Sequence, residues 1–273
     1  MNARVFVGDT RSDAIPADDR GVAYGDGLFE TMRAHRGEVP WWDAHWARLR
    51  AGAQRLRIPL PDEAQVRNEA MELLSGANAA LKLIVTRGTG GRGYAPADDA
   101  APIWIVSTHP LPPSPFDEGI TTRWCETRLA VQPLLAGIKH CNRLEQVLAR
   151  AEWNALTAQD RNVAEGLMRS TEGDVVCATA ANLFVLRNDR WHTPPVDRCG
   201  VAGVCRAWAL RELDAAESRL DVTAIEQADA VFLCNAVRGI LPVAKLGGRE
   251  WAPHPRVEAA RERLSAAHPG FAP

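Results

Sequence analysis

Lysine is nearly absent from this 273-residue chain, which has three lysines against 29 arginines. Arginine stays protonated and cannot form a Schiff base, whereas a lysine that loses its proton can attack a carbonyl carbon. Any imine chemistry is therefore limited to Lys82, Lys139 and Lys245.

Features of several other protein classes are missing too. The six cysteines form no CxxC pair and the seven histidines no HExxH motif, so we expect neither a metal site nor a disulfide framework. A net charge of −2 gives no surplus of positive charge for nucleic acid. No stretch approaches the roughly 20 apolar residues of a membrane span, and charged residues near the N-terminus argue against a targeting segment. We expect a soluble, cytoplasmic protein.

Apolar periodicity predicts strands interrupted by occasional helices, which indicates an α+β fold rather than strict β-α-β alternation. A hairpin is expected around the turn at 35–38, and Asp43 is expected to cap the first helix. The helices are expected over 43–56, 62–74, 142–156, 203–213 and 255–267.

A segment with four prolines interrupts every period and is the best candidate for a linker between domains. We place the linker at 108–116. Residues 1–107 then form a small N-terminal α+β domain, and residues 117–273 form a larger C-terminal α/β domain that carries Lys139.

Lys139 is the best candidate for a reactive amine. It ends an expected strand at 135–139 and precedes a helix that Asn142 is expected to cap, with Glu145 completing a capping box. Apolar neighbours would lower the pKa of the amine toward that of a usable nucleophile. An ordinary lysine is the alternative on local sequence alone. Lys82 alternates with apolar residues, as on the solvent face of a strand, and Lys245 is expected in a turn.

Residues 88–93 satisfy the pattern GxGxxG. They lead into Tyr94 and another strand rather than a helix, so a Rossmann dinucleotide site is not expected. Two interpretations stay open. The segment is either a flexible turn or a loop that presents Arg87 and Arg92 to a substrate carboxylate.

Glycines at 200 and 203 precede an expected helix, and free N–H groups at a helix start favour a phosphate. A second candidate anion site follows the strand that ends near Asn235. Together with a desolvated lysine, these features suggest a phosphorylated aldehyde, and pyridoxal 5'-phosphate fits both needs.

Seven motifs in order resemble the fold-type IV pyridoxal-phosphate enzymes, a two-domain family similar to class IV and D-amino-acid aminotransferases. The motifs are DRGVAYGDGLFET (19–31), AHWARL (44–49), TRGTGGRGY (86–94), IKHCNRLEQ (138–146), ANLF (181–184), GVAGVCR (200–206) and CNAVRGILPV (234–243). Within the family, the run 139–146 is most similar to 4-amino-4-deoxychorismate lyases.

The resemblance implies a role for individual residues. Lys139 would bind the cofactor covalently, and Arg143 would lie near its ring. Tyr24 would line the substrate pocket, where Arg92 and Tyr94 would hold a carboxylate. The phosphate contacts would come from Arg48, Val204, Cys205, Asn235 and Ala236.

One position departs from the family pattern. Members usually carry a glutamate five residues before the asparagine of the NLF motif, where it pairs with the protonated pyridine nitrogen. Here that position is Cys177. A neutral thiol is a poor partner for a pyridinium, so the ring would be a weaker electron sink. Glu172 or Asp174 could compensate only with a different strand register.

The resemblance therefore implies a carbon–oxygen lyase that converts 4-amino-4-deoxychorismate to 4-aminobenzoate and pyruvate in folate biosynthesis, acting as a homodimer. The first alternative is a class IV aminotransferase for D- or branched-chain amino acids. The second is a non-enzymatic protein that carries the cofactor in a decayed site.

Overall fold

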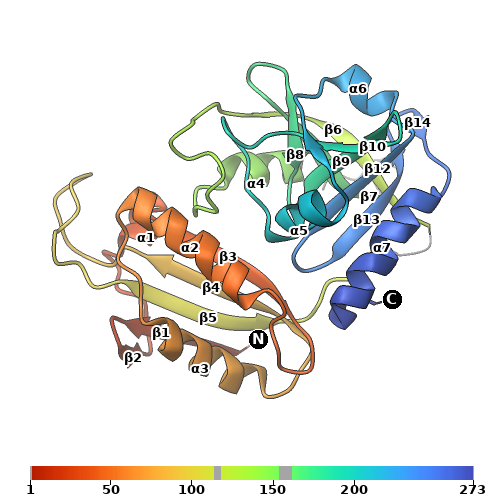
Figure 1. Ribbon diagram of the computed structural model, residues 1–273. Coiled ribbons are helices and arrows are strands. Elements are labelled where there is room, and N and C mark those ends of the chain that lie inside the picture. The colour runs from red at the N-terminus through yellow and green to blue at the C-terminus, as the bar shows by residue number, and fades with distance from the viewer. Residues whose placement is uncertain (1, 114–117, 154–161, 273) are drawn as a thin grey trace. The chain divides into compact units, whose positions relative to one another are not determined.

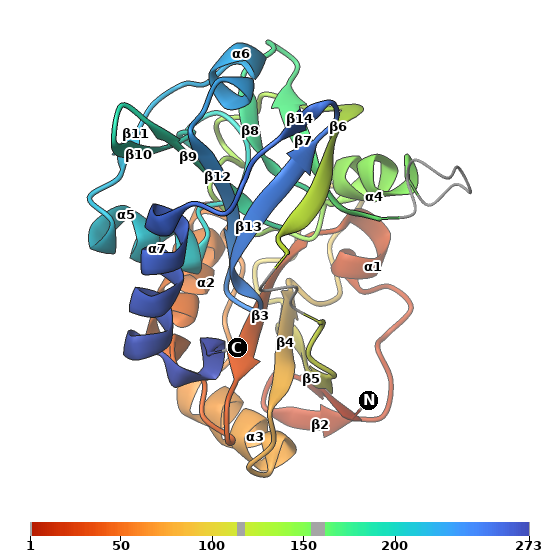
Figure 2. The same ribbon diagram turned by 90° about the vertical axis from the view of Figure 1, so that its right-hand side faces the viewer.

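The computed structural model describes residues 2–113, 118–153 and 162–272. The chain divides into two compact units (Figures 1 and 2). The first consists of Met1–Pro112 and Ile138–Asn142, and the second of Pro113–Gly137 and Arg143–Pro273.

The first unit is built on a five-stranded antiparallel sheet in the order β2-β1-β5-β4-β3. Its strands are β1 (Asn2–Val7), β2 (Thr10–Ser12), β3 (Gly27–Ala34), β4 (Ala79–Thr86) and β5 (Ile103–His109). Helix α2 (Trp42–Leu56) packs on β3, and helix α3 (Glu63–Leu74) packs on β5 and β4 (Figure 1).

Both helices cover the same face of this sheet. Glu30, Leu83, Val106 and Arg4 form one row across four strands. At one end of the row, Glu30 pairs with Arg48 of α2. At the other end, Arg4 pairs with Glu72 of α3. Along β3, the side chains on this covered face are buried, and those at 29, 31 and 33 on the other face are partly exposed. This alternation is the period of two expected for a strand with one buried face.

The first unit contains a short helix that the sequence did not predict. Helix α1 (Arg20–Tyr24) begins where Asp19 Oδ1 accepts from the main-chain N–H of Val22, and it ends at Gly25, whose φ is +66°. The turn at 35–38 is closed by an antiparallel bridge between His35 and Glu38, as expected of a hairpin turn, but the chain then leads into α2 rather than a second strand. The expected cap of α2 was wrong, because the helix begins after Trp41 and Asp43 lies inside its first turn.

The segment Ile138–Asn142 packs with the first unit, whereas the sequence assigned Lys139 to the second domain. The N–H of Phe29 donates to Lys139 O at 3.0 Å, and the N–H of Cys141 donates to Gly27 O at 2.8 Å. The segment thus lies along the edge of β3, not as the strand expected at 135–139. The boundary between the units at Pro112 falls within the segment proposed as a linker.

The second unit is built on a nine-stranded mixed sheet in the order β11-β10-β9-β12-β13-β6-β7-β8, with β14 paired to β13. Strand β6 pairs in parallel with both β13 and β7. The strands are β6 (Ile120–Leu129), β7 (Val163–Ser170), β8 (Val175–Ala178), β9 (Asn182–Arg187), β10 (Arg190–Thr193), β11 (Ala216–Glu217), β12 (Ala230–Asn235), β13 (Gly239–Leu246) and β14 (Arg249–Glu250).

The helices of this unit are α4 (Leu144–Ala151), α5 (Val204–Glu212), α6 (Val222–Glu226) and α7 (Pro255–Ala267), followed by a 3-10 turn (Pro269–Phe271). Helix α7 lies against β13 and β12 (Figure 2) and has the predicted bounds. The short α6 was not predicted. Of the helix expected at 142–156, residues 154–156 lie outside the described residues.

The capping box expected at the start of α4 is absent. Arg143 occupies the cap position and makes no side-chain cap. The amide of Asn142 donates instead to Gly25 O at 3.1 Å, and Glu145 Oε1 accepts from the N–H of Ala130 at 2.7 Å. Strands β8 and β9 are separated by a turn in which Ala178 N–H donates to Ala181 O. Within 2–113, 118–153 and 162–272, no helix is long and apolar enough to cross a membrane.

Candidate functional site

The main chain of Lys139 is fixed by the hydrogen bonds to β3 described above. Those bonds use the carbonyl of Lys139 and the N–H of Cys141. On the other side of Lys139, its neighbour Ile138 is buried against Gly52 of α2, where a Cβ would lie 2.6 Å from Ile138 Cγ2. Only glycine permits this approach of helix and segment. The side chain of Lys139 places its ammonium 4.3 Å from the centroid of the Phe29 ring. Lys139 is thus a positioned amine beside an aromatic face, not a side chain extended into solvent.

Lys82 lies near the same ring. Its ammonium is 5.6 Å from the centroid of Phe29, and in the sheet Lys82 pairs with Thr31, two residues along β3. Among the described residues, no carboxylate lies within ion-pair distance of Lys82. The sequence placed Lys82 on the outer face of β4, but it could not show that Lys139 lies beside the same ring.

Arg48 belongs to a buried network with Glu30 and His45. Helix α2 presents His45 and Arg48 on one face, and β3 directs Glu30 toward them. Arg48 Nε donates to Glu30 Oε1 at 2.8 Å, and its Nη2 donates to Oε2. His45 Nδ1 lies 2.6 Å from Oε2. A bidentate pair of this kind fixes the plane of the guanidinium. The sequence identified Arg48 but not its two partners. Glu30 could have been found, because it lies on the same strand face as Leu28 and Met32, where a buried acid needs a partner.

The charges in this network are defined by burial and pairing. Burial would raise the pKa of Glu30, but the charge of Arg48 and the hydrogen bonds of His45 and Arg48 outweigh it and lower the pKa to about 2. Burial lowers the pKa of His45, although Glu30 opposes this shift. At neutral pH, a neutral imidazole therefore donates to an ionised carboxylate, and Arg48 carries the positive charge.

Three residues implied in substrate binding also lie in the first unit. Tyr24 ends α1, while Arg92 and Tyr94 lie in the loop between β4 and β5. The rings of Tyr24 and Tyr94 are 5.6 Å apart, and both side chains are exposed, as is Arg92. These residues are therefore accessible to a ligand in the described part of the chain.

Arg87 does not have the role suggested for it from the sequence. It is buried and makes a bidentate pair with Asp26, at 2.7 Å from Nε and 3.0 Å from Nη2. Its Nη2 also donates to Leu56 O at the end of α2. The interpretation in which the loop presents Arg87 to a substrate was wrong, because the Arg87 guanidinium is hydrogen-bonded to Asp26 and to the last carbonyl groups of α2.

The second unit contains the features expected of a phosphate site. Helix α5 begins after Gly203, which provides no side-chain cap for the first-turn N–H groups. A Cβ at Gly203 would lie 2.1 Å from Asn182 Oδ1, and Asn182 Nδ2 donates to Val201 O at 2.9 Å. Val204 and Cys205 are buried at the helix start. A hydrogen bond with Cys234 and burial raise the pKa of Cys205, so it is a neutral thiol that joins α5 to β12.

The turn after β12 is shaped by the side chain of Asn235. Its Oδ1 accepts from the N–H groups of Val237 and Arg238 at 3.0 and 2.8 Å, and its Nδ2 donates to Ala180 O at 3.2 Å. Ala236 follows in the same turn and offers only its main chain as a polar contact. Asn235 therefore ties the turn after β12 to the turn between β8 and β9.

A buried acid joins the same two turns. Glu165 Oε1 accepts from Arg238 at 2.8 Å, and Oε2 accepts from the hydroxyl of Thr179 at 2.6 Å. Glu165 is 3% exposed. The sequence did not single out this acid, because nothing local distinguishes it from an ordinary residue of β7.

Cys177 lies in β8 opposite Met168 and is buried. Burial raises the pKa of its thiol to about 12, with a further contribution from Cys199, while the charge of Arg143 acts in the opposite direction. Cys177 is therefore a neutral thiol at physiological pH, and Arg143 is close enough for its charge to act on it.

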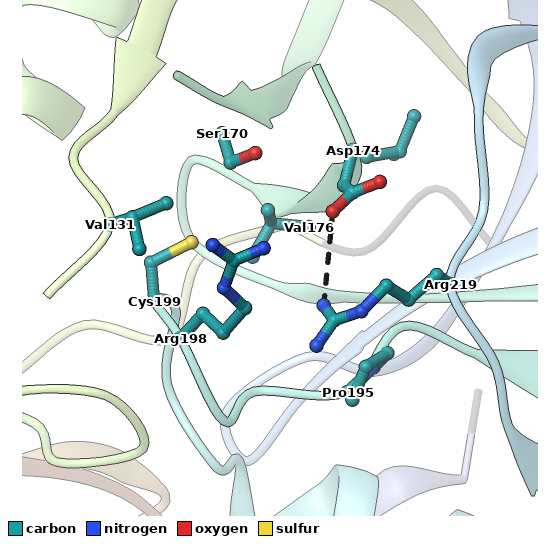
Figure 3. Close-up of a pocket in the computed structure, with 9 residues that line it drawn as sticks. Val131, Ser170, Asp174, Val176, Pro195, Arg198, Cys199 and Arg219 are labelled. Atoms are coloured by element: carbon teal, nitrogen blue, oxygen red, sulfur yellow. Dashed lines mark ion pairs between the residues drawn. The ribbon is translucent and has the colours of Figure 1, made fainter. Parts of the chain in front are cut away.

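The two acids considered as substitutes for Cys177 have other partners. Glu172 pairs with Arg198, and Asp174 lies 3.8 Å from Arg219. Figure 3 shows Asp174 and both arginines around a small cavity together with Cys199. Its volume of about 10 Å³ is the room that one water molecule needs. The cavity is too small for a substrate, and its charges are paired.

Comparisons with known proteins show which family this chain belongs to. The family model for class IV aminotransferases matches residues 27–246. An aminodeoxychorismate lyase from Vibrio harveyi is 36% identical over 245 residues, which cover 86% of this chain and 89% of the relative. A D-alanine aminotransferase from Bacillus licheniformis is 26% identical over 247 residues, 86% of this chain and 84% of the relative.

The crystal structure of 4-amino-4-deoxychorismate lyase from Pseudomonas aeruginosa superposes with a TM-score of 0.87. The two sequences are 40% identical, and the match covers 96% of this chain and 98% of the other. The fold-type IV architecture expected from the sequence motifs is thus confirmed.

Proposed function

Because this chain belongs to the class IV aminotransferase family, whose members use pyridoxal 5'-phosphate, we propose that it is a lyase that converts 4-amino-4-deoxychorismate to 4-aminobenzoate and pyruvate. The observation that carries the proposal is a likeness to lyases over most of the chain, at 36% and 40% identity. The geometry of Lys139 supports it. The reaction is a step of folate biosynthesis.

The residues of each unit fit the cofactor. In the first unit, Lys139 supplies the amine that binds an aldehyde, and Glu30 holds Arg48 as a fixed cation for a phosphate. In the second unit, the first turn of α5 has no side-chain cap, so its N–H groups suit an anion. We assign the remaining phosphate contacts to the main chain at Val204, Cys205, Asn235 and Ala236.

The bound cofactor supplies an aldehyde that holds the substrate amine and a ring that withdraws electrons from the carbon bearing that amine. With the cofactor bound, Lys139 would be the general base that removes the proton from this carbon. Cleavage of the C–O bond at the neighbouring ring carbon would make the substrate ring aromatic. The departing enolate would gain a proton at carbon and become pyruvate.

The substrate carries two carboxylates, and the first unit offers cations for them. We propose that Lys82 binds one carboxylate, since it lies beside Phe29 with Lys139 and pairs with no described acid. We assign the other to Arg92, with Tyr24 and Tyr94 lining the pocket.

Replacing Lys82 by methionine is expected to raise KM for aminodeoxychorismate about tenfold, since a charge-assisted hydrogen bond contributes roughly 1.5–3 kcal/mol. We expect kcat to change little, because the reactive amine is retained. Steady-state assays of 4-aminobenzoate formation measure both constants. Lys82→Arg should keep most of the affinity. Lys245→Met is the matched control, because that lysine pairs with Glu250 at an exposed position. An unchanged KM in Lys82→Met would exclude the assigned role.

Cys177 bears on the choice between lyase and aminotransferase. We propose that its neutral thiol faces the pyridine nitrogen, where it cannot stabilise a protonated ring. Elimination tolerates this weak electron sink because aromatisation supplies much of its driving force. Reversible transamination has no such source and relies more on the ring.

Replacing Cys177 by glutamate is therefore expected to raise the transaminase rate with D-alanine and 2-oxoglutarate at least tenfold and to shift the visible absorption of the bound cofactor. Cys177→Ser, which keeps a neutral group, is the matched control. Rates and spectra are measured on purified protein of equal cofactor content. If neither changes in Cys177→Glu, the ring nitrogen is not governed by this position.

The alternative function is a class IV aminotransferase, favoured by the similarity to D-alanine aminotransferase and sharing the same lysine. The two functions separate in one experiment. The purified protein is supplied with aminodeoxychorismate or, separately, with D- or branched-chain amino acids and 2-oxoglutarate. We expect 4-aminobenzoate and pyruvate in equal amounts from the first. Transamination without lyase products would favour the alternative.

We also propose that the protein is a homodimer in the cytoplasm. Sedimentation of the purified protein measures its oligomeric state.

A further inference from the structure

The loop between β4 and β5 has little conformational preference of its own. Four of its glycines, at 88, 90, 91 and 93, have φ values of +92°, +97°, +86° and +57°. Glycine adopts such angles readily but also many others, so its presence does not fix one path. Within the loop, two main-chain hydrogen bonds of 3.1 and 3.2 Å join Arg92 and Ala95. A loop of this composition needs contacts from outside to hold Arg92 and Tyr94 in one arrangement.

Arg20, the first residue of α1, provides such contacts near the start of the loop and at its middle. Its main-chain N–H donates to Gly88 O at 2.9 Å. Its guanidinium donates to Gly93 O at 2.9 Å and to Tyr94 O at 3.1 Å. The same guanidinium lies 5.0 Å from the centroid of the Tyr24 ring. One side chain therefore contacts both the loop and the tyrosine that approaches it.

Arg20 is itself held in place. It is only 5% exposed, and its Nε donates to Asp26 Oδ2 at 3.1 Å. Asp26 also accepts hydrogen bonds from Nε and Nη2 of Arg87. Arg87 in turn donates to Leu56 O at the end of α2. Burial would raise the pKa of Asp26, but Arg87 and Arg20 outweigh it and lower the pKa. Asp26 stays ionised, and through Arg87 it connects Arg20 to the end of α2.

The contact also orients two dipoles. The carbonyl oxygens of residues 93 and 94 accept from Arg20, so their negative ends are directed at its cation. A carboxylate that approaches the exposed side of the loop then meets less repulsion from those oxygens. Sequence motifs marked the loop, but the residue that determines its path lies about 70 positions earlier in the chain.

We infer that Arg20 is a positioning residue for substrate binding, which fixes the loop in the arrangement where Arg92 and Tyr94, beside Tyr24, bind a carboxylate. The substrate part of this inference rests on the proposed function. Arg20 acts through the loop and does not itself touch the substrate.

Limited trypsin digestion of the holoenzyme tests the structural part directly, because the exposed Arg92 is itself a cleavage site. In Arg20→Met, we expect cleavage after Arg92, followed by mass spectrometry, to be at least tenfold faster than in the wild type. Arg4→Met is the matched control. Arg4 is partly buried and pairs with Glu69 and Glu72 of α3, and no hydrogen bond joins it to the loop in the described part of the chain. Equal rates in Arg20→Met and wild type would overturn the inference.

Kinetics test the functional part. We expect Arg20→Met to raise KM for aminodeoxychorismate about tenfold, with kcat within threefold and bound cofactor unchanged. Arg20→Lys, which keeps the charge but not the fork, should recover part of the loss. In an Arg92→Ala background, Arg20→Met should add no further increase. Independent, multiplying effects on KM would overturn the inference, as would an equal rise in Arg4→Met.

These outcomes are separable from the proposed function. If the wild type forms no 4-aminobenzoate while Arg20→Met is still cleaved faster at Arg92, the lyase assignment fails and the role of Arg20 in holding the loop stands. If lyase activity is present but cleavage and KM are unaltered, the assignment stands and the inference fails.

Discussion

Replacing Lys139 by alanine is expected to lower kcat for 4-aminobenzoate formation by about 10⁴-fold or more. The variant loses both the amine that binds the cofactor and the general base, and a positioned base alone contributes roughly 10²–10⁴-fold. A discontinuous assay of 4-aminobenzoate at saturating substrate measures the loss. Because the cofactor phosphate contacts remain, we expect the variant to bind pyridoxal 5'-phosphate without a covalent bond.

Two controls make this result specific. Lys139→Arg keeps a cation beside Phe29 but provides no amine that forms a Schiff base, so it should be as inactive as the alanine variant. Lys245→Ala removes another of the three lysines, one that is exposed and pairs with Glu250, and should keep full activity. A Lys139→Ala variant that retains more than a tenth of the wild-type kcat would exclude Lys139 as the reactive amine.

Replacing Glu30 by glutamine is expected to weaken binding of pyridoxal 5'-phosphate by about 10- to 100-fold. The amide leaves Arg48 and His45 with an altered partner in a buried site, and loss of one partner of a buried pair costs several kcal/mol. The plane of the Arg48 guanidinium is then no longer fixed for the phosphate. Spectroscopic titration of the apoenzyme measures the dissociation constant.

Pyridoxal, which lacks the phosphate, separates this effect from a general loss of structure. If Glu30 acts through Arg48, Glu30→Gln should leave pyridoxal binding nearly unchanged and abolish much of the preference for the phosphorylated form. Arg48→Met should have the same effect, and the double variant should be no worse than Arg48→Met. A parallel loss for both aldehydes would show that the network is merely structural.

The helices were largely predictable because their signals are local. Helix α7 has the expected bounds, and α3 begins one residue after the expected start, since Asp62 caps it through its side chain. Both have an apolar period of three to four residues and a recognisable first turn. The short helices α1 and α6 contain too few residues to show an apolar period, so they were not predicted.

Errors arose where a residue has a distant partner. Asn142 suits a cap by type, but its amide donates to Gly25 O, 117 residues earlier. Arg87 has the right chemistry to bind a substrate carboxylate, yet its guanidinium binds Asp26 and the end of α2. In each case, the side chain makes the kind of hydrogen bond that the sequence suggested, but the tertiary structure determines its partner.

In the candidate site, too, local motifs were predictable and distant contacts were not. Motifs identified Lys139 and Arg48, whereas Glu30, Arg20 and Lys82 emerged only from strand register and packing. Lys82 approaches Phe29 because β4 pairs with β3 in the observed register, and a shift by one residue would direct it to the other face. The packing of Ile138–Asn142 against β3 was similarly invisible, because it joins segments more than 100 residues apart.

The central claim is that the amine of Lys139 forms the covalent bond to the cofactor, and reduction of the purified holoenzyme with borohydride tests it most directly. The chain has only three lysines, so peptide mass spectrometry after proteolysis assigns the adduct without ambiguity. We predict one phosphopyridoxyl group per chain, on Lys139, with loss of the visible absorption and of lyase activity. A label on Lys82 or Lys245, or no label on a protein that forms 4-aminobenzoate, would contradict the account.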